Sequence, residues 1–469
     1  MINPAVIEKL KTVAGRKGWS EDATEIAPHV IESRGKYSGH TPLLLKPETM
    51  AQVSTILAIC NDTLTPIVPQ GGNTGLVGGQ IPFDGEVLLS LSRMNRVRHV
   101  DAPGMNMIVE SGVILANAQA AAAGADRLFP LSLASEGSAT IGGNISTNAG
   151  GVHVLHYGSA RDLVLGIEAV LADGRVLDLL RTLRKDNTGY DLKQLFIGSE
   201  GTLGVVTAIA LKLFPKPAEY TTAFIAVRDP QAAIDLLGRL QDATSGSISA
   251  FELLPRIGIE FVLAHTPQTS DPLTAPSQWY VLAEASGGRH AGLKEGMQDA
   301  LGLASEAGLV TDAVLAANEA QRSALWRLRE SMSEAQKPEG GSIKHDVSVP
   351  VKDIPAFLKS GIAAVERLVP GVRPVPFGHL GDGNIHFNFS VPKGGDSAKF
   401  LARWEEISRA VHDIVHHLGG SISAEHGLGV MKREEILRYK SAAEMDVMRA
   451  LKRTLDPNNI LNPGKVVSL

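Results

Sequence analysis

Residues 69–79 read Pro69-Gln70-Gly71-Gly72-Asn73-Thr74-Gly75-Leu76-Val77-Gly78-Gly79 and follow a short apolar run at 65–68. The glycines would let successive backbone N–H groups converge on an anion, as phosphate binding requires. The usual dinucleotide fingerprint is excluded, because Asn73 interrupts the glycine spacing and residues 86–91 read as a strand where a helix is needed. A P-loop is excluded too, since no Gly-Lys-Ser or Gly-Lys-Thr follows. Taken alone, the stretch is also compatible with a long surface loop.

Two further segments of small residues strengthen the interpretation of the first segment as a binding loop. Residues 135–151 read Ser-Glu-Gly-Ser-Ala-Thr-Ile-Gly-Gly-Asn-Ile-Ser-Thr-Asn-Ala-Gly-Gly, which permits close backbone approach. Neutral hydrogen-bonding groups in this segment are supplied by Thr140, Asn144, Thr147 and Asn148. A flat heteroaromatic ring with donors and acceptors on its edge needs such a lining. The third segment, Gly-Ser-Glu-Gly-Thr-Leu-Gly at 198–204, precedes a strand-like run at 205–213.

A histidine-containing turn predicts a metal site. Residues 378–388 read Gly-His-Leu-Gly-Asp-Gly-Asn-Ile-His-Phe-Asn, with His379 and His386 seven positions apart. On one straight strand this odd separation would point the imidazoles to opposite faces, but the Gly-Asp-Gly turn reverses the chain and lets them converge. Glu425 offers a carboxylate, and His426 follows it directly. Two histidines and one carboxylate, with an open position, are typical of catalytic zinc.

The alternative for each histidine taken singly is a structural role, so the prediction depends on the ensemble. His412, His416 and His417 form a competing cluster, in which His412 and His416 are four apart on an expected helix. The sequence around these three histidines contains no motif typical of a metal site with an open coordination position. We therefore interpret it as a solvated helix face.

Composition excludes several classes of function. The chain has 469 residues and a net charge of -5, which predicts two or three domains and gives no broad positive field for nucleic acid. No window approaches the roughly 18 consecutive apolar residues of a membrane span. Cys60 is the only cysteine, which excludes an internal disulfide and suggests inert packing. With no signal-peptide pattern at the N-terminus, we expect a cytoplasmic protein.

Periodicity predicts where the elements lie. Residues 66–214 should be mostly strands and loops, because long helical periodicity is scarce there, whereas strands and helices alternate after Pro215. Expected helices cover 1–13, with Asn3 as the cap, and 230–240, 318–336, 354–368, 399–417 and 432–455. Expected strands cover 222–227, 247–254, 278–284, 342–349 and two runs within 373–391. The second pattern suggests a sheet covered on one face by helices.

The three glycine segments resemble the FAD-binding domain of the vanillyl-alcohol oxidase and p-cresol methylhydroxylase type. The tail Leu-Asn-Pro-Gly-Lys at 461–465 is similar to the end of the D-lactate and glycolate dehydrogenase branch. Members with covalently attached flavin often carry a histidine in the first loop, and its absence here implies non-covalent FAD. The residues implied to contact FAD are Pro69, Gly71, Gly72, Asn73, Thr74, Gly75, Gly78, Gly137, Thr140, Gly142, Gly143, Asn144, Thr147, Asn148, Gly150, Gly151, Glu200, Gly204 and Asn462.

The motifs around the histidines narrow the resemblance to FAD-dependent D-2-hydroxy acid dehydrogenases. Gly-His-x-Gly-Asp-Gly-Asn-x-His at 378–386 and Ser-Ala-Glu-His-Gly at 423–427 are similar to motifs of the D-lactate, glycolate and D-2-hydroxyglutarate enzymes. The resemblance implies that His379, His386 and Glu425 bind a divalent metal, with zinc preferred, and that His426 is the catalytic base. A hydroxyl near a divalent cation loses its proton more easily, and a nearby imidazole can accept that proton.

The hydroxyglutarate branch also suggests the substrate-binding residues. In that branch an arginine, a threonine and a lysine hold the substrate carboxylates, and the matching positions here are Arg329, Ser333 and Lys344. Ser333 keeps the hydroxyl of the threonine and lacks its methyl group. Asn388 completes a His-x-Asn variant similar to the same branch. The alternative for these cations is an ordinary solvated surface.

The resulting hypothesis is oxidation of D-2-hydroxyglutarate to 2-oxoglutarate, with D-malate as a second substrate. His426 would take the hydroxyl proton, and the carbon-bound hydrogen would leave as hydride to the flavin. Oxidation of D-lactate or glycolate by the same chemistry is the nearest alternative. A zinc hydrolase whose glycine segments are only structural is the remote one.

We expect an α+β architecture in four parts. Residues 1–36 form a helical lead, 37–215 the FAD-binding domain, 216–398 a substrate or cap domain with an antiparallel sheet and helices, and 399–469 a helical part that returns towards the flavin. The expected partners are a small 2-hydroxy acid and an electron acceptor that no short motif identifies. A homodimer is one assembly left open.

Overall fold

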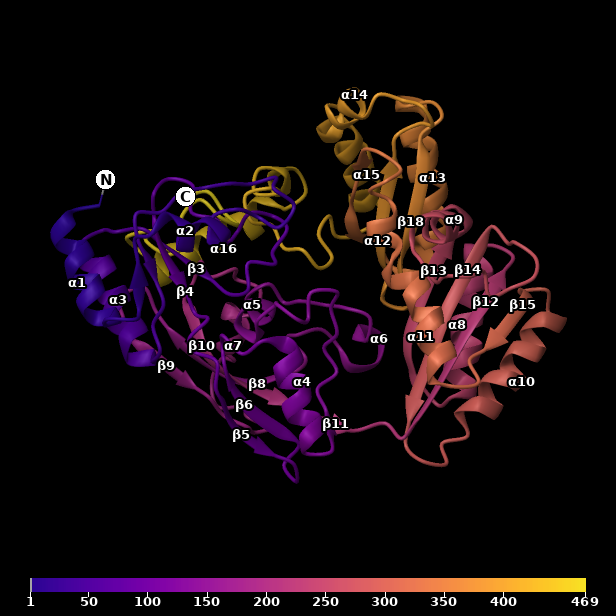
Figure 1. The fold of residues 1–469 in the computed structure, drawn as a ribbon, viewed down its shortest axis with the longest axis horizontal. Coiled ribbons are helices and arrows are strands. Elements are labelled where there is room, and N and C mark those ends of the chain that lie inside the picture. Colours follow the sequence, from indigo (N-terminus) through magenta and orange to yellow (C-terminus); the bar gives the residue numbers. More distant parts are fainter. Residues whose placement is uncertain (1) are drawn as a thin grey trace. The chain divides into compact units, whose positions relative to one another are not determined.

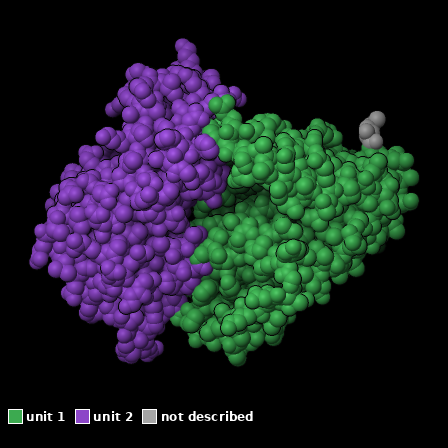
Figure 2. Space-filling view, turned by 180° about the vertical axis from the view of Figure 1, so that it is seen from behind, with its two compact units in different colours: residues 1–151, 158–216, 425–469 green, residues 152–157, 217–424 purple. Residues whose placement is uncertain are grey.

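The computed structural model describes residues 2–469, which form two compact units. Unit 1 comprises the chain up to residue 151 together with 158–216 and 425–469, and unit 2 comprises 152–157 and 217–424 (Figure 2). The last 45 residues therefore belong to the same unit as the glycine segments. Helices α14 (Ser397–Leu401) and α15 (Trp404–His417), by contrast, belong to unit 2. The four-part division expected from the sequence stays a prediction.

Unit 1 begins with a small sheet flanked by helices. Its strand order is β1 (Trp19–Ser20), β2 (Leu44–Leu45), β4 (Val87–Ser90), β3 (Ile67–Gln70), and β2 and β3 both run parallel to β4. Helices α1 (Pro4–Ala14) and α3 (Met50–Asp62) share an apolar core with it. The expected cap of α1 is confirmed, because the Asn3 side chain accepts a hydrogen bond from the Ala5 N–H at 2.9 Å. Strand β3 leads directly into the first glycine segment.

Cys60 lies in this core. Its side chain is fully buried on α3, and burial raises the pKa of the thiol to about 12. A thiol in this environment does not ionise near neutral pH. The interpretation of Cys60 as inert packing agrees with this environment.

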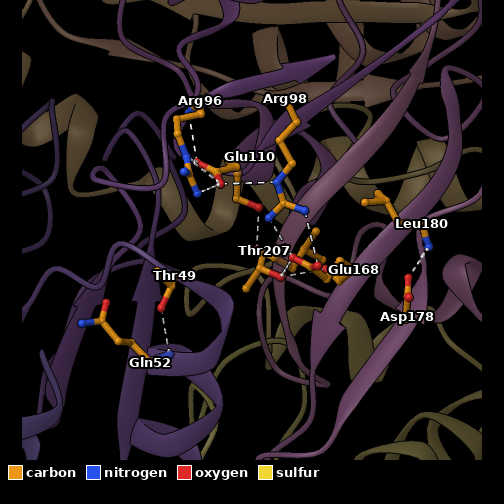
Figure 3. A network of polar contacts seen from close by, with 11 residues as sticks. Thr49, Gln52, Arg96, Arg98, Glu110, Glu168, Asp178, Leu180 and Thr207 are labelled. Carbon is orange, nitrogen blue, oxygen red and sulfur yellow. Dashed lines mark hydrogen bonds and ion pairs between the residues drawn. The ribbon is translucent and has the colours of Figure 1, made fainter. Parts of the chain in front are cut away.

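The second sheet of unit 1 is antiparallel throughout, in the order β5 (Val97–Asp101), β6 (Asn106–Glu110), β10 (Val205–Lys212), β8 (Val164–Val170), β9 (Val176–Leu179). A polar network ties these strands together (Figure 3). Buried Glu110 accepts hydrogen bonds from Arg96, at 2.8 Å, and Arg98, at 3.3 Å, while Arg98 also reaches Glu168 at 3.1 Å. Thr207 donates to Glu168 at 2.8 Å. We interpret the network as structural, since each member bonds to a neighbouring strand.

Residues 66–214 are mostly strands and loops, as the sequence pattern predicted. The helices of this region are short and comprise α4 (Leu115–Gly124), α5 (Ile141–Ser146), α6 (Val154–Tyr157) and α7 (Lys193–Phe196). Helix α4 is alanine-rich and lacks a side-chain cap, and the others are at most six residues long. Such helices leave little periodic signal. The remaining elements of unit 1 are α2 (Ala23–Ile26), β7 (Arg127–Leu128), β11 (Phe214–Pro215) and α16 (Ala442–Leu455).

Unit 2 is built on a larger antiparallel sheet (Figure 1). Its order is β15 (Val310–Leu315), β12 (Glu219–Val227), β14 (Trp279–Gly287), β13 (Ile248–Pro255), β18 (Arg373–His379), β19 (Asn384–Ser390), β16 (Ser342–Ile343), and β17 (Asp346–Ser348) also pairs with β19. Its helices are α6, α8 (Pro230–Ala243), α9 (Arg256–His265), α10 (Leu293–Glu306), α11 (Glu319–Glu330), α12 (Met332–Ala335), α13 (Ile354–Leu368), α14 and α15. The α+β class and the antiparallel sheet are confirmed.

Both faces of this sheet are covered, and the expectation of one covered face was wrong. Strand β13 is buried at every position. Phe224 and Leu254 pack in a core with Trp326 of α11, while α8 and α10 also pack against the sheet. The near-continuous apolar runs of β12, β13 and β14 are the sequence signal for a strand buried on both sides.

Two predicted elements are interrupted near the candidate site. The helix expected over 318–336 breaks at Ser331 into α11 and α12, so Arg329 and Ser333 belong to different helices. The strand expected over 342–349 is split into β16 and β17 around Lys344 and His345. In contrast, the helix predicted over 354–368 is α13 itself. Within residues 2–469, no helix is long and apolar enough to cross a membrane.

Candidate active site

The turn between β18 and β19 brings His379 and His386 together. His386 is the cross-strand partner of Phe377, near the end of β18. Gly383 has φ of 90°, and a Cβ there would collide with the Val349 carbonyl, so this turn requires glycine. The two imidazole centroids are 5.4 Å apart, and one ring nitrogen from each lies within 4.8 Å of the other. The predicted convergence of the two histidines is confirmed.

A buried carboxylate that the sequence analysis did not identify lies behind His379. Glu252 is the cross-strand partner of His379, and its Oε1 is 2.5 Å from His379 Nδ1. Its Oε2 accepts a 2.5 Å hydrogen bond from Arg329 Nε. Burial raises the pKa of Glu252, but Arg329 and His379 outweigh this and hold it well below its usual range. One carboxylate in the otherwise apolar run Ala-Phe-Glu-Leu-Leu was the available signal.

His386 also has a carboxylate neighbour. Asp346 is its cross-strand partner, with Oδ1 3.7 Å from His386 Nδ1, and Asn384 Nδ2 donates to the same oxygen at 2.9 Å. The backbone carbonyl of Asp346 accepts from the Ala424 N–H at 3.2 Å. This hydrogen bond joins residue 424 to the strand pair that carries His386.

Glu425 itself is the first residue of the C-terminal part of unit 1. Its Oε1 accepts a 2.6 Å hydrogen bond from the Gly151 N–H, at the end of the second glycine segment. A Cβ added to Gly150 would lie 2.8 Å from the same oxygen, which explains the need for glycine there. His426 follows and is half-buried. The second glycine segment therefore fixes the residue next to the candidate base.

Glu200 holds the chain just beyond His426. Its two carboxylate oxygens accept hydrogen bonds from the N–H groups of Leu428, at 2.7 Å, and Gly429, at 2.9 Å. Asn462 Nδ2 donates to the carbonyls of Glu200, at 2.8 Å, and Gly79, at 2.9 Å. Burial raises the pKa of the Glu200 carboxyl despite the two backbone donors. The first and third glycine segments, the tail and the base segment thus meet around one carboxyl.

The first two glycine segments are packed against each other. A Cβ at Gly71 would collide with Thr140 Oγ1, and one at Gly72 with the Ser138 carbonyl. Asn73 has φ of 54°, and its amide nitrogen donates to the carbonyls of Pro28 and Ile31. The Asn73 side chain thus fixes the shape of the loop. This packing explains why glycine occupies the two positions.

Two buried amide atoms in this region are unsatisfied. In the part of the chain that the structure describes, Asn144 Nδ2 and Asn462 Oδ1 have no hydrogen-bond partner. Buried polar atoms are normally satisfied, so each is suited to bonding with a bound group. Both residues are among those implied to contact FAD. The packed glycine segments and these two atoms fit a ligand with a flat, polar-edged ring.

The four residues predicted to bind substrate do not all contact one another. Arg329 is buried, bonded to Glu252 and 5.1 Å from the centre of the Phe377 ring. Lys344 Nζ lies 3.2 Å from the Ser333 carbonyl and 3.3 Å from its hydroxyl. Asn388 is buried and donates to Gln336 Oε1 at 3.2 Å. Ser333 and Lys344 are therefore in contact, even though the helix and the strand that carry them are both interrupted.

The interpretation of His412, His416 and His417 as one solvated face was partly wrong. His416 and His417 are exposed, but His412 is buried, with its ring centroid 5.9 Å from that of His345. The His345 ring contacts the Phe387 carbonyl at 2.7 Å and Ser408 Oγ at 3.1 Å. His412 faces the core because it shares a helix side with buried Val411 and Val415.

Two family models cover most of the chain. One described as "FAD binding domain" matches residues 41–180, and one described as "FAD linked oxidases, C-terminal domain" matches residues 216–466. The second match alone spans more than half of the chain. The chain belongs to the FAD-linked oxidase family. This FAD-linked oxidase is an FAD-dependent dehydrogenase.

Named relatives extend over nearly all of this oxidase. It is 40% identical to D-2-hydroxyglutarate dehydrogenase, mitochondrial, from Arabidopsis thaliana, over 98% of the chain and 81% of that protein. It is 36% identical to a D-2-hydroxyglutarate–pyruvate transhydrogenase from Saccharomyces cerevisiae, over 96% of the chain and 91% of that protein. The predicted resemblance to the D-2-hydroxyglutarate branch is confirmed.

The comparisons also bear on fold and location. The structure of p-cresol methylhydroxylase with substrate bound matches with a TM-score of 0.78 at 18% identity, covering 98% of the chain and 96% of that protein. This likeness confirms the p-cresol methylhydroxylase type of fold. The expected cytoplasmic location was wrong, because the names of the plant and animal relatives place them in mitochondria. The lack of a signal-peptide pattern does not distinguish the cytoplasm from a mitochondrion.

Proposed function

We propose that this protein oxidises D-2-hydroxyglutarate to 2-oxoglutarate, using non-covalent FAD and a divalent metal, with D-malate as a poorer substrate. The observation that carries the proposal is the pair of imidazoles, 5.4 Å apart, on the β18–β19 turn, backed by two carboxylates. The hydroxyglutarate relatives support the choice of substrate. A zinc hydrolase would have no use for the FAD-binding domain.

The metal proposal names His379, His386 and Glu425 as ligands. Neutral imidazole and carboxylate are a donor set that suits zinc, although other divalent ions accept it. The metal, when bound, increases the acidity of a nearby hydroxyl. His426, directly after Glu425, is the group that we assign to accept the substrate proton.

The FAD proposal assigns the cofactor to the three glycine segments. FAD, when bound, accepts two electrons from the substrate carbon, which balances oxidation of the alcohol to a ketone. The chain's own part is to present convergent backbone N–H groups from 71–75 and the unsatisfied amides of Asn144 and Asn462. The first segment contains no histidine for covalent attachment.

Acid precipitation tests the non-covalent state. We expect purified protein to be yellow and to release intact FAD into the supernatant on acid or heat denaturation, because no covalent bond retains it. The flavin in supernatant and pellet would be measured by absorbance and by chromatography. Flavin that stays with the precipitated chain would contradict the non-covalent state, and a colourless protein would contradict the whole proposal.

The substrate proposal depends on cations that would bind a second carboxylate. Lys344 and Ser333 are in contact, and Arg329 is buried nearby in the chain. We assign Lys344, Ser333, Arg329 and Asn388 to substrate binding. A monocarboxylate such as D-lactate would need fewer of these donors once its hydroxy acid end is bound. D-malate is one methylene shorter and should therefore lie between the two.

A substrate panel with an artificial dye acceptor tests this assignment. Lys344→Met should lower kcat/KM for D-2-hydroxyglutarate by roughly 10- to 150-fold, because a charge-assisted hydrogen bond is worth about 1.5–3 kcal/mol. D-Lactate and D-2-hydroxybutyrate should be affected far less. Lys337→Met, which removes an exposed lysine paired with Glu334, is the matched control. Equal losses on all substrates, or a wild-type preference for D-lactate, would favour the monocarboxylate alternative.

A further inference from the structure

Two buried glutamates of unit 2 each form an ion pair with an arginine of the same helix. Arg322 and Arg329 are seven residues apart on α11, which places them on the same face two turns apart. Arg322 bonds Glu284 of β14 through Nε, at 2.7 Å, and Nη2, at 2.9 Å. Arg329 bonds Glu252 of β13 through Nε at 2.5 Å. Both glutamate side chains are fully buried, on neighbouring strands.

The two glutamates differ in the further hydrogen-bond partners of their carboxylate oxygens. Glu284 Oε2 takes further hydrogen bonds from Thr222, at 2.6 Å, and Trp326, at 2.8 Å, so it serves the packing of the helix on the sheet. Glu252 instead gives its second oxygen to His379 Nδ1, at 2.5 Å. One of two similar ion pairs is therefore joined to a histidine that we assign to the metal.

We propose that Glu252 is a positioning residue for the metal, with Arg329 as its counter-charge; this inference rests on the proposed function. A carboxylate at Nδ1 keeps the proton on that nitrogen and fixes the ring, so His379 would bind a metal through Nε2. Cross-strand pairing of Glu252 with His379 fixes the position of the carboxylate relative to the ring. Asp346 is the cross-strand partner of His386, and its Oδ1 lies 3.7 Å from the corresponding ring nitrogen, His386 Nδ1.

The inference gives Arg329 a role that does not require substrate. Its Nε proton is used by Glu252, and its guanidinium lies over the Phe377 ring. Without that positive charge, the fully buried Glu252 would be an uncompensated anion and would no longer be held at the ring. Replacement of Arg329 should therefore weaken metal binding in the absence of any hydroxy acid. A residue that only bound substrate would not affect that measurement.

Metal affinity of the FAD-loaded protein tests the inference. Zinc binding would be measured without substrate, by competition with a chromophoric chelator, for wild type, Glu252→Gln, Arg329→Gln and the matched control Glu284→Gln. We expect Glu252→Gln to weaken zinc binding by about 10- to 100-fold, with a smaller loss for Arg329→Gln. Glu284→Gln should keep the wild-type affinity. The absorption spectrum of the cobalt-substituted protein should change for Glu252→Gln and stay unchanged for Glu284→Gln.

FAD content and thermal denaturation would be recorded for every variant. All three glutamine variants should unfold at lower temperature than wild type, because each loses a buried ion pair. Wild-type metal affinity and cobalt spectrum in Glu252→Gln would overturn the inference while leaving the proposed function intact. Equal loss of affinity in Glu284→Gln would also overturn it, since packing alone would then explain the effect. A wild-type protein that binds no metal would instead remove the metal from the proposed function.

Discussion

Replacement of His386 by alanine is expected to lower turnover of D-2-hydroxyglutarate by about a thousandfold or more, while FAD stays bound. The metal would contribute several kcal/mol of charge stabilisation, and about 4 kcal/mol corresponds to roughly a thousandfold in rate. His386 and His379 belong to unit 2, whereas the segments assigned to FAD belong to unit 1. The substitution removes no residue that we assign to FAD, so the cofactor should stay bound.

Chelation of the wild-type protein should reproduce the effect of His386→Ala. Turnover would be measured with a dye acceptor after removal of the chelator, with metal content verified by elemental analysis, and zinc should restore activity to wild type but not to the variant. His416→Ala is the matched control, because His416 is an exposed histidine of the same unit. Full activity in a verified metal-free preparation would contradict the metal assignment.

The histidine pair could be predicted because its geometry is local. Only six residues, which include the glycine turn, lie between His379 and His386, so the local sequence contains the information needed to reverse the chain and align the rings. The glycine segments could likewise be predicted as places of close backbone approach, because small residues are needed there, although the sequence did not show that the first two pack against each other. Short-range patterns can be interpreted from the sequence because no distant partner has to be known.

Partners that come from distant strands could not be predicted. Glu252 is 127 residues from His379 in the chain, and only the β13–β18 pairing brings the two together. The break of the helix at Ser331 and the burial of His412 have similar causes, since packing of the surrounding elements decides both. A charged residue within an apolar strand indicates a buried polar contact, but the sequence does not identify the partner.

The second large effect concerns His426. His426→Ala or His426→Asn should retain FAD and metal but lose turnover by about the 10²–10⁴ typical of general-base removal. The neighbours of His426 are held independently of its ring: Glu425 accepts from the Gly151 N–H at 2.6 Å, and Glu200 holds the N–H groups of Leu428 and Gly429. Removing the imidazole should therefore leave the backbone of the segment in place.

The pH dependence of the rate separates a base from a structural histidine. If His426 accepts the substrate proton, the pH profile of kcat should differ between wild type and the residual activity of His426→Asn. His417→Asn, which changes an exposed histidine on α15, should keep both the rate and the profile. A His426 variant with normal turnover and an unchanged profile would exclude this residue as the base. Loss of FAD together with activity would instead indicate that the ring supports the fold of the segment, because a group that acts only on the proton has no reason to alter cofactor binding.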